Sequence, residues 1–169
     1  MNKIVIIIPS RLNARRLPNK PLKLINNKEM ILHVYDSAAR SSAGEVYVAT
    51  PDQKIVDIVK NFGGNAIKTS DNHETGTDRI FEVFKETLNS EPNIIINLQG
   101  DMPNLEPQAI SNLVSYMNKN KCDIGTLASD FSSKIEIDNP NIVKVAVKEK
   151  LSNDIFLNAL DFFRVKTNS

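Results

Sequence analysis

Short apolar segments rich in β-branched residues alternate with segments of helical period along most of this chain. Six of the apolar segments predict strands, at residues 3–8, 45–49, 65–68, 93–98, 123–128 and 143–147. The first reads Ile-Val-Ile-Ile-Ile from residue 4 to residue 8. Hydrophobicity that is continuous rather than alternating is typical of strands covered on both faces.

Between the predicted strands, apolar residues recur at helical spacing, which favours amphipathic helices. These positions are Met30, Ile31, Val34, Tyr35 and Ala38; Ile55, Ile58 and Val59; Ile80, Phe81, Phe84 and Leu88; and Ile110, Leu113, Val114 and Met117. Thr77 or Asp78 is the expected cap of the third helix. Alternating strands and helices predict an α/β protein with a mostly parallel sheet in a three-layer α/β/α sandwich.

Composition and charge narrow the class of protein. A chain of 169 residues with 41% apolar and 24% charged residues suits one soluble domain over residues 1–169. A net charge of +1 argues against a general nucleic-acid or membrane surface. Cys122 is the only cysteine, which excludes an internal disulfide and a cysteine-based metal site. With no long apolar run and no signal peptide in the first residues, we expect a cytoplasmic protein.

The last part of the chain departs from this pattern. It carries large apolar side chains with nothing after them to supply a partner surface, namely Phe156, Leu157, Leu160, Phe162 and Phe163. Either this segment packs back on the sheet, or it meets another subunit, or the chain is shorter than the fold to which it belongs.

Four cations follow the first predicted strand, in a loop that Pro18 and Pro21 stiffen. They are Arg11, Arg15, Arg16 and Lys20. Ligands of open α/β sheets lie at the carboxyl ends of the strands, and guanidinium and ammonium groups suit phosphate oxygens. No glycine-rich phosphate cradle is present, so side chains would hold a polyphosphate here. The alternative is a solvated surface loop.

Two further clusters belong at the same edge of the sheet. Gln99-Gly100-Asp101 follows the strand at 93–98, and one carboxylate facing phosphates suits Mg²⁺; the alternative is an aspartate of an ordinary turn. Residues 71–79, with Thr75, Gly76, Thr77 and Arg79, lead into a helix whose N-terminal N–H groups attract anions or a base edge. The alternative is a simple capping loop.

Six short motifs in this order resemble the cytidylyltransferases that activate 3-deoxy-manno-octulosonate (Kdo), the CMP-Kdo synthetases. They are Ile-Ile-Pro-Ser-Arg at 7–11, Arg-Leu-Pro-Asn-Lys-Pro-Leu at 16–22, Val-Ala-Thr at 48–50, His-Glu-Thr-Gly-Thr-Asp-Arg at 73–79, Asn-Leu-Gln-Gly-Asp at 97–101 and Asn-Pro-Asn-Ile-Val-Lys-Val at 139–145. The resemblance covers residues 1–147. It implies a Rossmann-like nucleotide-diphospho-sugar transferase fold and the transfer of CMP from CTP to Kdo for lipopolysaccharide biosynthesis.

The resemblance also implies roles for particular residues. Arg11 and Lys20 hold the phosphates of CTP with help from Arg16, and Asp101 binds Mg²⁺. The nucleotide pocket is lined by Thr75, Gly76, Thr77 and Arg79. Gln99 contacts nucleotide or sugar. The choice of base depends on backbone groups near Pro9, Ser10 and Thr75. Arg11, Lys20 and Asp101 are the implied catalytic residues, and a homodimer is the implied assembly.

Two departures from the family bear on activity. Met102 stands where family members have glutamate, which removes a second carboxylate beside Asp101. The likeness thins after Val147, and the family's sugar-binding and dimerisation portion is expected to be missing from a truncated chain. The alternatives are therefore an impaired or inactive nucleotide-binding remnant, a cytidylyltransferase for another acidic sugar such as sialate, or a Rossmann-like domain whose cations only solvate a loop.

Overall fold

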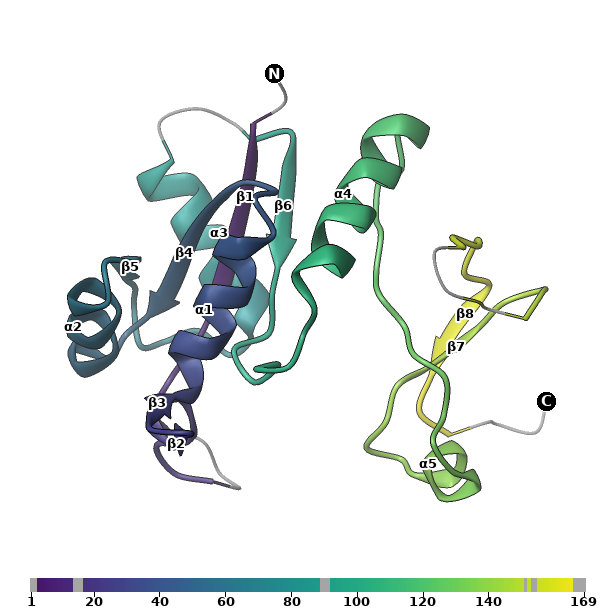
Figure 1. Cartoon of the computed structure of the whole chain (residues 1–169), viewed down its shortest axis with the longest axis horizontal. Helices are drawn as coiled ribbons and strands as arrows, with labels where there is room; N and C mark the ends of the chain where they lie inside the picture. Colours follow the sequence, from purple (N-terminus) through teal and green to yellow (C-terminus); the bar gives the residue numbers. More distant parts are fainter. Residues whose placement is uncertain (1–2, 14–16, 89–91, 151, 153–154, 166–169) are drawn as a thin grey trace. The chain divides into compact units, whose positions relative to one another are not determined.

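A parallel sheet of four strands forms the centre of the first part of the molecule (Figure 1). The computed structural model describes residues 3–13, 17–88, 92–150, 152 and 155–165. Packing divides the chain into two units, 1–114 and 115–169, which are described separately. In the first unit the strands are β1 (Ile4–Pro9), β4 (Glu45–Thr50), β5 (Asn65–Lys68) and β6 (Ile94–Asn97), in the order β5-β4-β1-β6. All three neighbouring pairs are parallel.

Alternate side chains of β1 enter two different cores. Ile6 and Ile8 pack in a core with side chains of α1 (Met30–Arg40), α2 (Gln53–Asn61) and the start of α4 (Pro107–Asn120). Val5 and Ile7 pack in a second core with α3 (Gly76–Thr87). All four β1 side chains are fully buried, as the apolar run predicted. The predicted mostly parallel sheet with helices on both faces is confirmed.

Each of the four predicted helices forms, but one of their core positions was predicted wrongly. Phe81 of α3 is 54% exposed, whereas Ile80 and Val83 are buried. Residues 80 and 83 are neighbours on one face of a helix, while residue 81 lies about a quarter-turn away. Among the described residues, no helix is both long and apolar enough to span a membrane.

A small hairpin that the hydrophobic pattern did not predict follows β1. A 3₁₀ helix, η1 (Lys20–Leu22), leads into β2 (Leu24–Ile25) and β3 (Lys28–Glu29), which pair antiparallel. Asn26 and Asn27 form the turn with φ of 48° and 61°, the left-handed conformation that asparagine tolerates in tight hairpins. The hairpin connects the cation-rich loop to the start of α1.

The second unit holds the end of α4, the short helix α5 (Lys134–Asp138) and an antiparallel pair, β7 (Lys144–Ala146) with β8 (Asp161–Phe163). Two strand predictions are corrected here. Residues 123–128 form no strand, and Ile124 is 89% exposed; an apolar run without a hydrogen-bonding neighbour has no ladder to join. Residues 143–147 do contain a strand, β7, but it pairs with β8 and not with the parallel sheet.

The apolar tail finds part of its cover within this unit. Phe156 stacks on Tyr116 of α4, with ring centroids 4.1 Å apart and planes 16° apart. Phe162 in β8 stays 55% exposed. The expectation of one domain over residues 1–169 stays a prediction.

Candidate functional site

Residues of the three sequence clusters line two adjoining cavities at the carboxyl end of the parallel sheet. The larger, of about 160 Å³, is lined by Pro9, Ser10, Arg11, Lys20, Pro21, Met30, Gln99, Gly100 and Asp101. The smaller, of about 120 Å³, is lined by Pro9, Ser10, Arg11, His73, Glu74, Thr75, Gly76, Arg79 and Gln99. Because four residues line both, the two cavities adjoin and together make up the candidate site, at the edge where a parallel sheet is expected to bind ligands.

The loop after β1 is anchored by backbone amides on both sides of Arg11. The Ser10 N–H donates to the Ala49 carbonyl at 2.9 Å, and the Leu12 N–H donates to Asp52 Oδ2 at 2.8 Å. Arg11 itself is exposed and lines both cavities. The anchored backbone therefore presents a guanidinium to the site.

Ser10 contributes a buried hydroxyl to both cavities. The residue is 7% exposed, and its Oγ has no hydrogen-bond partner among the described residues. A buried polar atom without a partner is costly and uncommon in native proteins. A ligand in the site would supply the missing partner.

Lys20 and Asp101 meet across the larger cavity. Lys20 begins η1, and its Nζ donates to Asp101 Oδ2 at 2.8 Å. The two side chains are 37% and 54% exposed, and pairs as exposed as this stabilise a fold by about 0–1 kcal/mol. The Lys20–Asp101 ion pair therefore contributes little to the stability of the fold, and breaking it costs little.

Gly100 allows the loop after β6 to approach the end of β1 closely. A Cβ added at Gly100 would lie 2.9 Å from the Pro9 carbonyl oxygen. The amide of Leu98, just before this turn, donates to the Ile7 carbonyl at 3.1 Å. The parallel pairing of β6 with β1 and the absent side chain at residue 100 together bring Asp101 to the cavity.

Thr75 and Asp78 form a capping box at the start of α3. Thr75 Oγ1 accepts the Asp78 N–H at 3.1 Å, and the Asp78 carboxylate accepts the Thr75 N–H at 3.1 Å. Hydrogen bonds from the Thr75 hydroxyl and backbone lower the pKa of Asp78. The cap is Thr75, so the prediction of Thr77 or Asp78 was wrong; Thr75 has the extended backbone of a cap, with φ −119° and ψ 161°.

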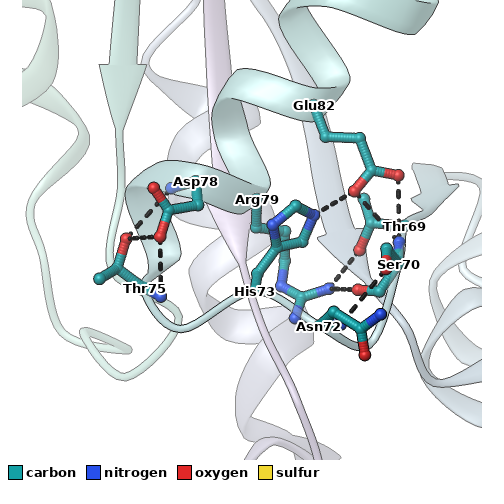
Figure 2. A network of polar contacts seen from close by, with 8 residues as sticks. All are labelled: Thr69, Ser70, Asn72, His73, Thr75, Asp78, Arg79 and Glu82. Carbon is teal, nitrogen blue, oxygen red and sulfur yellow. Dashed lines mark hydrogen bonds and ion pairs between the residues drawn. The ribbon is translucent and has the colours of Figure 1, made fainter.

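A polar network ties the loop before α3 to the helix itself (Figure 2). Arg79 is 3% exposed and donates from one guanidinium nitrogen to Thr69 Oγ1 and to the Ser70 carbonyl. Burial lowers the pKa of Arg79. Glu82 accepts the Ser70 N–H and pairs with His73 Nε2. The loop that carries Thr75 is thus held from two positions on α3.

Residues 5–168 match the family model described as Cytidylyltransferase. The chain belongs to the cytidylyltransferase family. It is 43% identical over 147 residues to the 3-deoxy-manno-octulosonate cytidylyltransferase of Thermodesulfovibrio yellowstonii, an alignment covering 83% of this chain and 58% of the relative. It is 39% identical over 163 residues to the protein of that name from Brucella ovis, with 96% and 64% covered.

The fold also matches a solved structure of the family. A CMP:2-keto-3-deoxy-manno-octonic acid synthetase complexed with CTP superposes with a TM-score of 0.80 and 38% identity, over 96% of this chain and 64% of that one. The resemblance predicted from the motifs is confirmed. The chain spans 58% and 64% of the length of the two curated relatives.

The structure brings together most of the residues that the sequence singled out. Those lining the site are Pro9, Ser10, Arg11, Lys20, Thr75, Gly76, Arg79, Gln99 and Asp101. Thr77 lies exposed in the first turn of α3 and is not a lining residue, and Arg16 lies outside the described residues. A larger cavity of about 370 Å³, beside α1 and residues 103–107, contains none of the predicted residues.

Sequence reasoning missed Glu82 as a member of the site's support. The feature of the sequence that relates Glu82 to the site is its i, i+3 spacing from Arg79, which places the two side chains at neighbouring positions on one helix face. The sequence alone did not show that the loop folds back to meet them. The sequence places His73 only among residues 71–79 and predicts no contact for it.

Proposed function

We propose that this chain binds CTP in the two adjoining cavities and that the whole protein transfers CMP to Kdo, releasing pyrophosphate. The observation that carries the proposal is the convergence of Arg11, Lys20 and Asp101 on one cavity in a member of the cytidylyltransferase family. The name of the curated relatives and the CTP complex of the solved neighbour support this choice of substrates. The same proposal places the reaction in lipopolysaccharide biosynthesis, in the cytoplasm, with a homodimer as the assembly.

The phosphates of CTP belong in the larger cavity. Arg11 offers a planar fork of donors and Lys20 a compact charge, which together suit the two outer phosphates. The smaller cavity, with Thr75 and Gly76 at the start of α3, takes the nucleoside. Ser10 and Gln99 line both cavities, and their side chains complete the hydrogen bonding where the cavities join.

The residues present fit a magnesium ion bound together with the nucleotide. Mg²⁺ uses one or two carboxylates and takes its other ligands from substrate phosphates and water. Asp101 offers one such carboxylate at the cavity, and no group of three or more metal-ligating residues occurs in the described parts of the chain. Bound Mg²⁺ would neutralise phosphate charge beside Asp101.

The transfer proposed for the whole protein is an in-line displacement. The anomeric hydroxyl oxygen of Kdo forms a bond to the α-phosphorus of CTP, while the bond from that phosphorus to the bridging oxygen breaks and pyrophosphate leaves. The hydroxyl proton is released. Arg11 and Lys20 hold the outer phosphates in line and stabilise the charge that gathers on the leaving group.

Calorimetric titration of this chain with CTP, UTP and ATP in the presence of Mg²⁺ tests the binding step. We expect selective CTP binding that Lys20→Ala weakens by about tenfold or more, the loss of roughly one charged contact. Lys23→Ala is the matched control, because Lys23 is exposed and lines neither cavity; its affinity should stay within about twofold.

An Asp101→Asn variant tests the proposed metal site in the same titration. Here the gain in CTP affinity on adding Mg²⁺ should shrink, while affinity in EDTA should hold or rise because a negative charge leaves the phosphate cavity.

The proposed function is overturned if the folded wild-type chain binds no CTP at millimolar concentration.

A further inference from the structure

The loop between β5 and α3 lines the smaller cavity with its last residues, and side chains of α3 determine its path. The loop starts where the Thr69 N–H donates to the Thr50 carbonyl at 2.9 Å. It then runs to His73, Glu74 and Thr75, which line the cavity. Residues 69–75 contain no glycine, and side chains of α3 contact the start of this loop.

Glu82 makes several of these contacts. Its two carboxylate oxygens accept the Ser70 N–H at 3.0 and 3.1 Å, and one of them pairs with His73 Nε2. The Glu82 and His73 side chains are only 17% and 19% exposed, so solvent screens the pair less than it screens a surface pair. Figure 2 shows the carboxylate between the imidazole and the Ser70 backbone.

Arg79 holds the other side of the same peptide segment. Its guanidinium donates to the Ser70 carbonyl at 2.9 Å and to Thr69 Oγ1. Both backbone groups of Ser70 are therefore bound by α3 side chains of opposite charge, one turn apart (Figure 2). Two such anchors restrict both the position and the orientation of the loop.

The charges around the pair favour this arrangement. Burial by itself raises the pKa of Glu82, but the hydrogen bonds from His73 and Ser70 and the charges of His73 and Arg79 outweigh it and lower the pKa. Arg11, Asp52 and Asp71 are the further charges that act on Arg79. At neutral pH Glu82 is therefore an ionised acceptor.

We propose that Glu82 is a positioning residue, which acts through Ser70 and His73 to hold the His73–Thr75 segment in the form that receives the nucleoside of CTP. Arg79 shares this role from the opposite side of Ser70. The inference rests on the proposed function, because the nucleoside is the group assigned to the smaller cavity. Glu82 itself is not a lining residue of that cavity.

The test combines CTP titration with amide hydrogen exchange on the ligand-free chain. We expect Glu82→Ala to weaken CTP binding about tenfold, in the range for loss of hydrogen bonds to a charged group. Glu82→Gln, which keeps one oxygen acceptor for the Ser70 N–H, should recover part of that loss. Glu86→Ala is the matched control, because Glu86 is exposed on the same helix and is not one of the network residues described above.

Hydrogen exchange separates positioning from general stability. In both Glu82 variants, amides of residues 70–75 should exchange faster, while amides of β1 should keep their wild-type rates. The inference is overturned if CTP affinity is unchanged in both variants, if exchange in 70–75 does not rise, or if it rises equally in β1. If the wild-type chain binds no CTP, the proposed function and the nucleoside assignment both fail. This titration comes first, before any variant is compared.

Discussion

At the residue scale, two buried serines of the first unit differ in the partner of their hydroxyl group. Ser10 Oγ lies at the site without a partner among the described residues, whereas Ser41 Oγ donates to the Ala38 carbonyl at 2.6 Å. The two residues are 7% and 8% exposed. A serine at the proposed CTP site can therefore be compared with a serine whose hydroxyl is already bonded within the protein.

Ser10→Ala should raise stability while weakening CTP binding. Removing an unsatisfied buried hydroxyl is worth up to about 1 kcal/mol, and the same change removes a contact for the ligand. Ser41→Ala should instead lower stability by about 1 kcal/mol and leave CTP affinity unchanged. Urea midpoints and CTP titrations of both variants check this; a destabilised Ser10→Ala protein would show that the hydroxyl has a structural partner.

At the element scale, the start of α3 combines the helix cap with the site. Thr75 and Asp78 satisfy N–H groups that the helix itself leaves open, and Gly76 lies against Pro9. A Cβ at Gly76 would be 3.2 Å from Pro9 Cγ. The element that presents the loop is therefore fixed both by its cap and by its contact with β1.

Thr75→Ala should destabilise the protein by about 1 kcal/mol at neutral pH, the usual loss for a removed cap. Thr77→Ala, in the exposed first turn, is the control and should change stability little.

Because Asp78 has a lowered pKa in the folded state, the stability it contributes is present above its ordinary pKa of 3.8 and is lost as pH falls through the lowered value.

Urea unfolding at neutral pH and at a pH below the lowered pKa of Asp78 measures both effects. The difference between wild type and Thr75→Ala should shrink at the lower pH, since protonation of Asp78 removes half of the capping box in the wild type. An equal difference at both pH values would mean that Asp78 takes no part in the cap.

At the scale of the whole molecule, the central strand β1 belongs to both cores of the first unit. Large-to-small changes in such close-packed interiors lose transfer free energy and leave cavities. The second unit instead leaves many large apolar side chains exposed, Ile124 and Ile135 among them, at 89% and 80%. Stability should therefore depend mainly on the parallel sheet.

Ile6→Ala should cost about 2–5 kcal/mol, because Ile6 is fully buried between the sheet and its helices. Ile124→Ala, at an 89% exposed position, should cost less than about 0.5 kcal/mol. Urea unfolding followed by far-ultraviolet circular dichroism gives both values. Similar losses at the two positions would mean that Ile124 is covered in solution.

The amino-acid sequence predicts the parallel sheet, because the apolar run of β1 needs cover on both faces and because strands alternate with amphipathic helices along the chain. It also determined the three clusters of site residues, since the loops after parallel strands must meet at one edge. The prediction of a strand at 123–128 was wrong. A short apolar run forms a strand only if another strand lies beside it to share hydrogen bonds. That condition is set by the rest of the fold.

The contacts that hold these residues in place form only in the folded molecule. The contacts of Glu82 and Arg79 with the Thr69–Ser70 segment span 9 to 12 positions, and they exist only once the loop folds back on α3. The same holds for the Lys20–Asp101 pair, whose members are separated by 81 positions, and for the buried Ser10 hydroxyl. Residue type and local spacing determine the elements, the charges and the burial of an apolar strand such as β1. The partners of polar side chains arise from contacts that the local pattern does not encode.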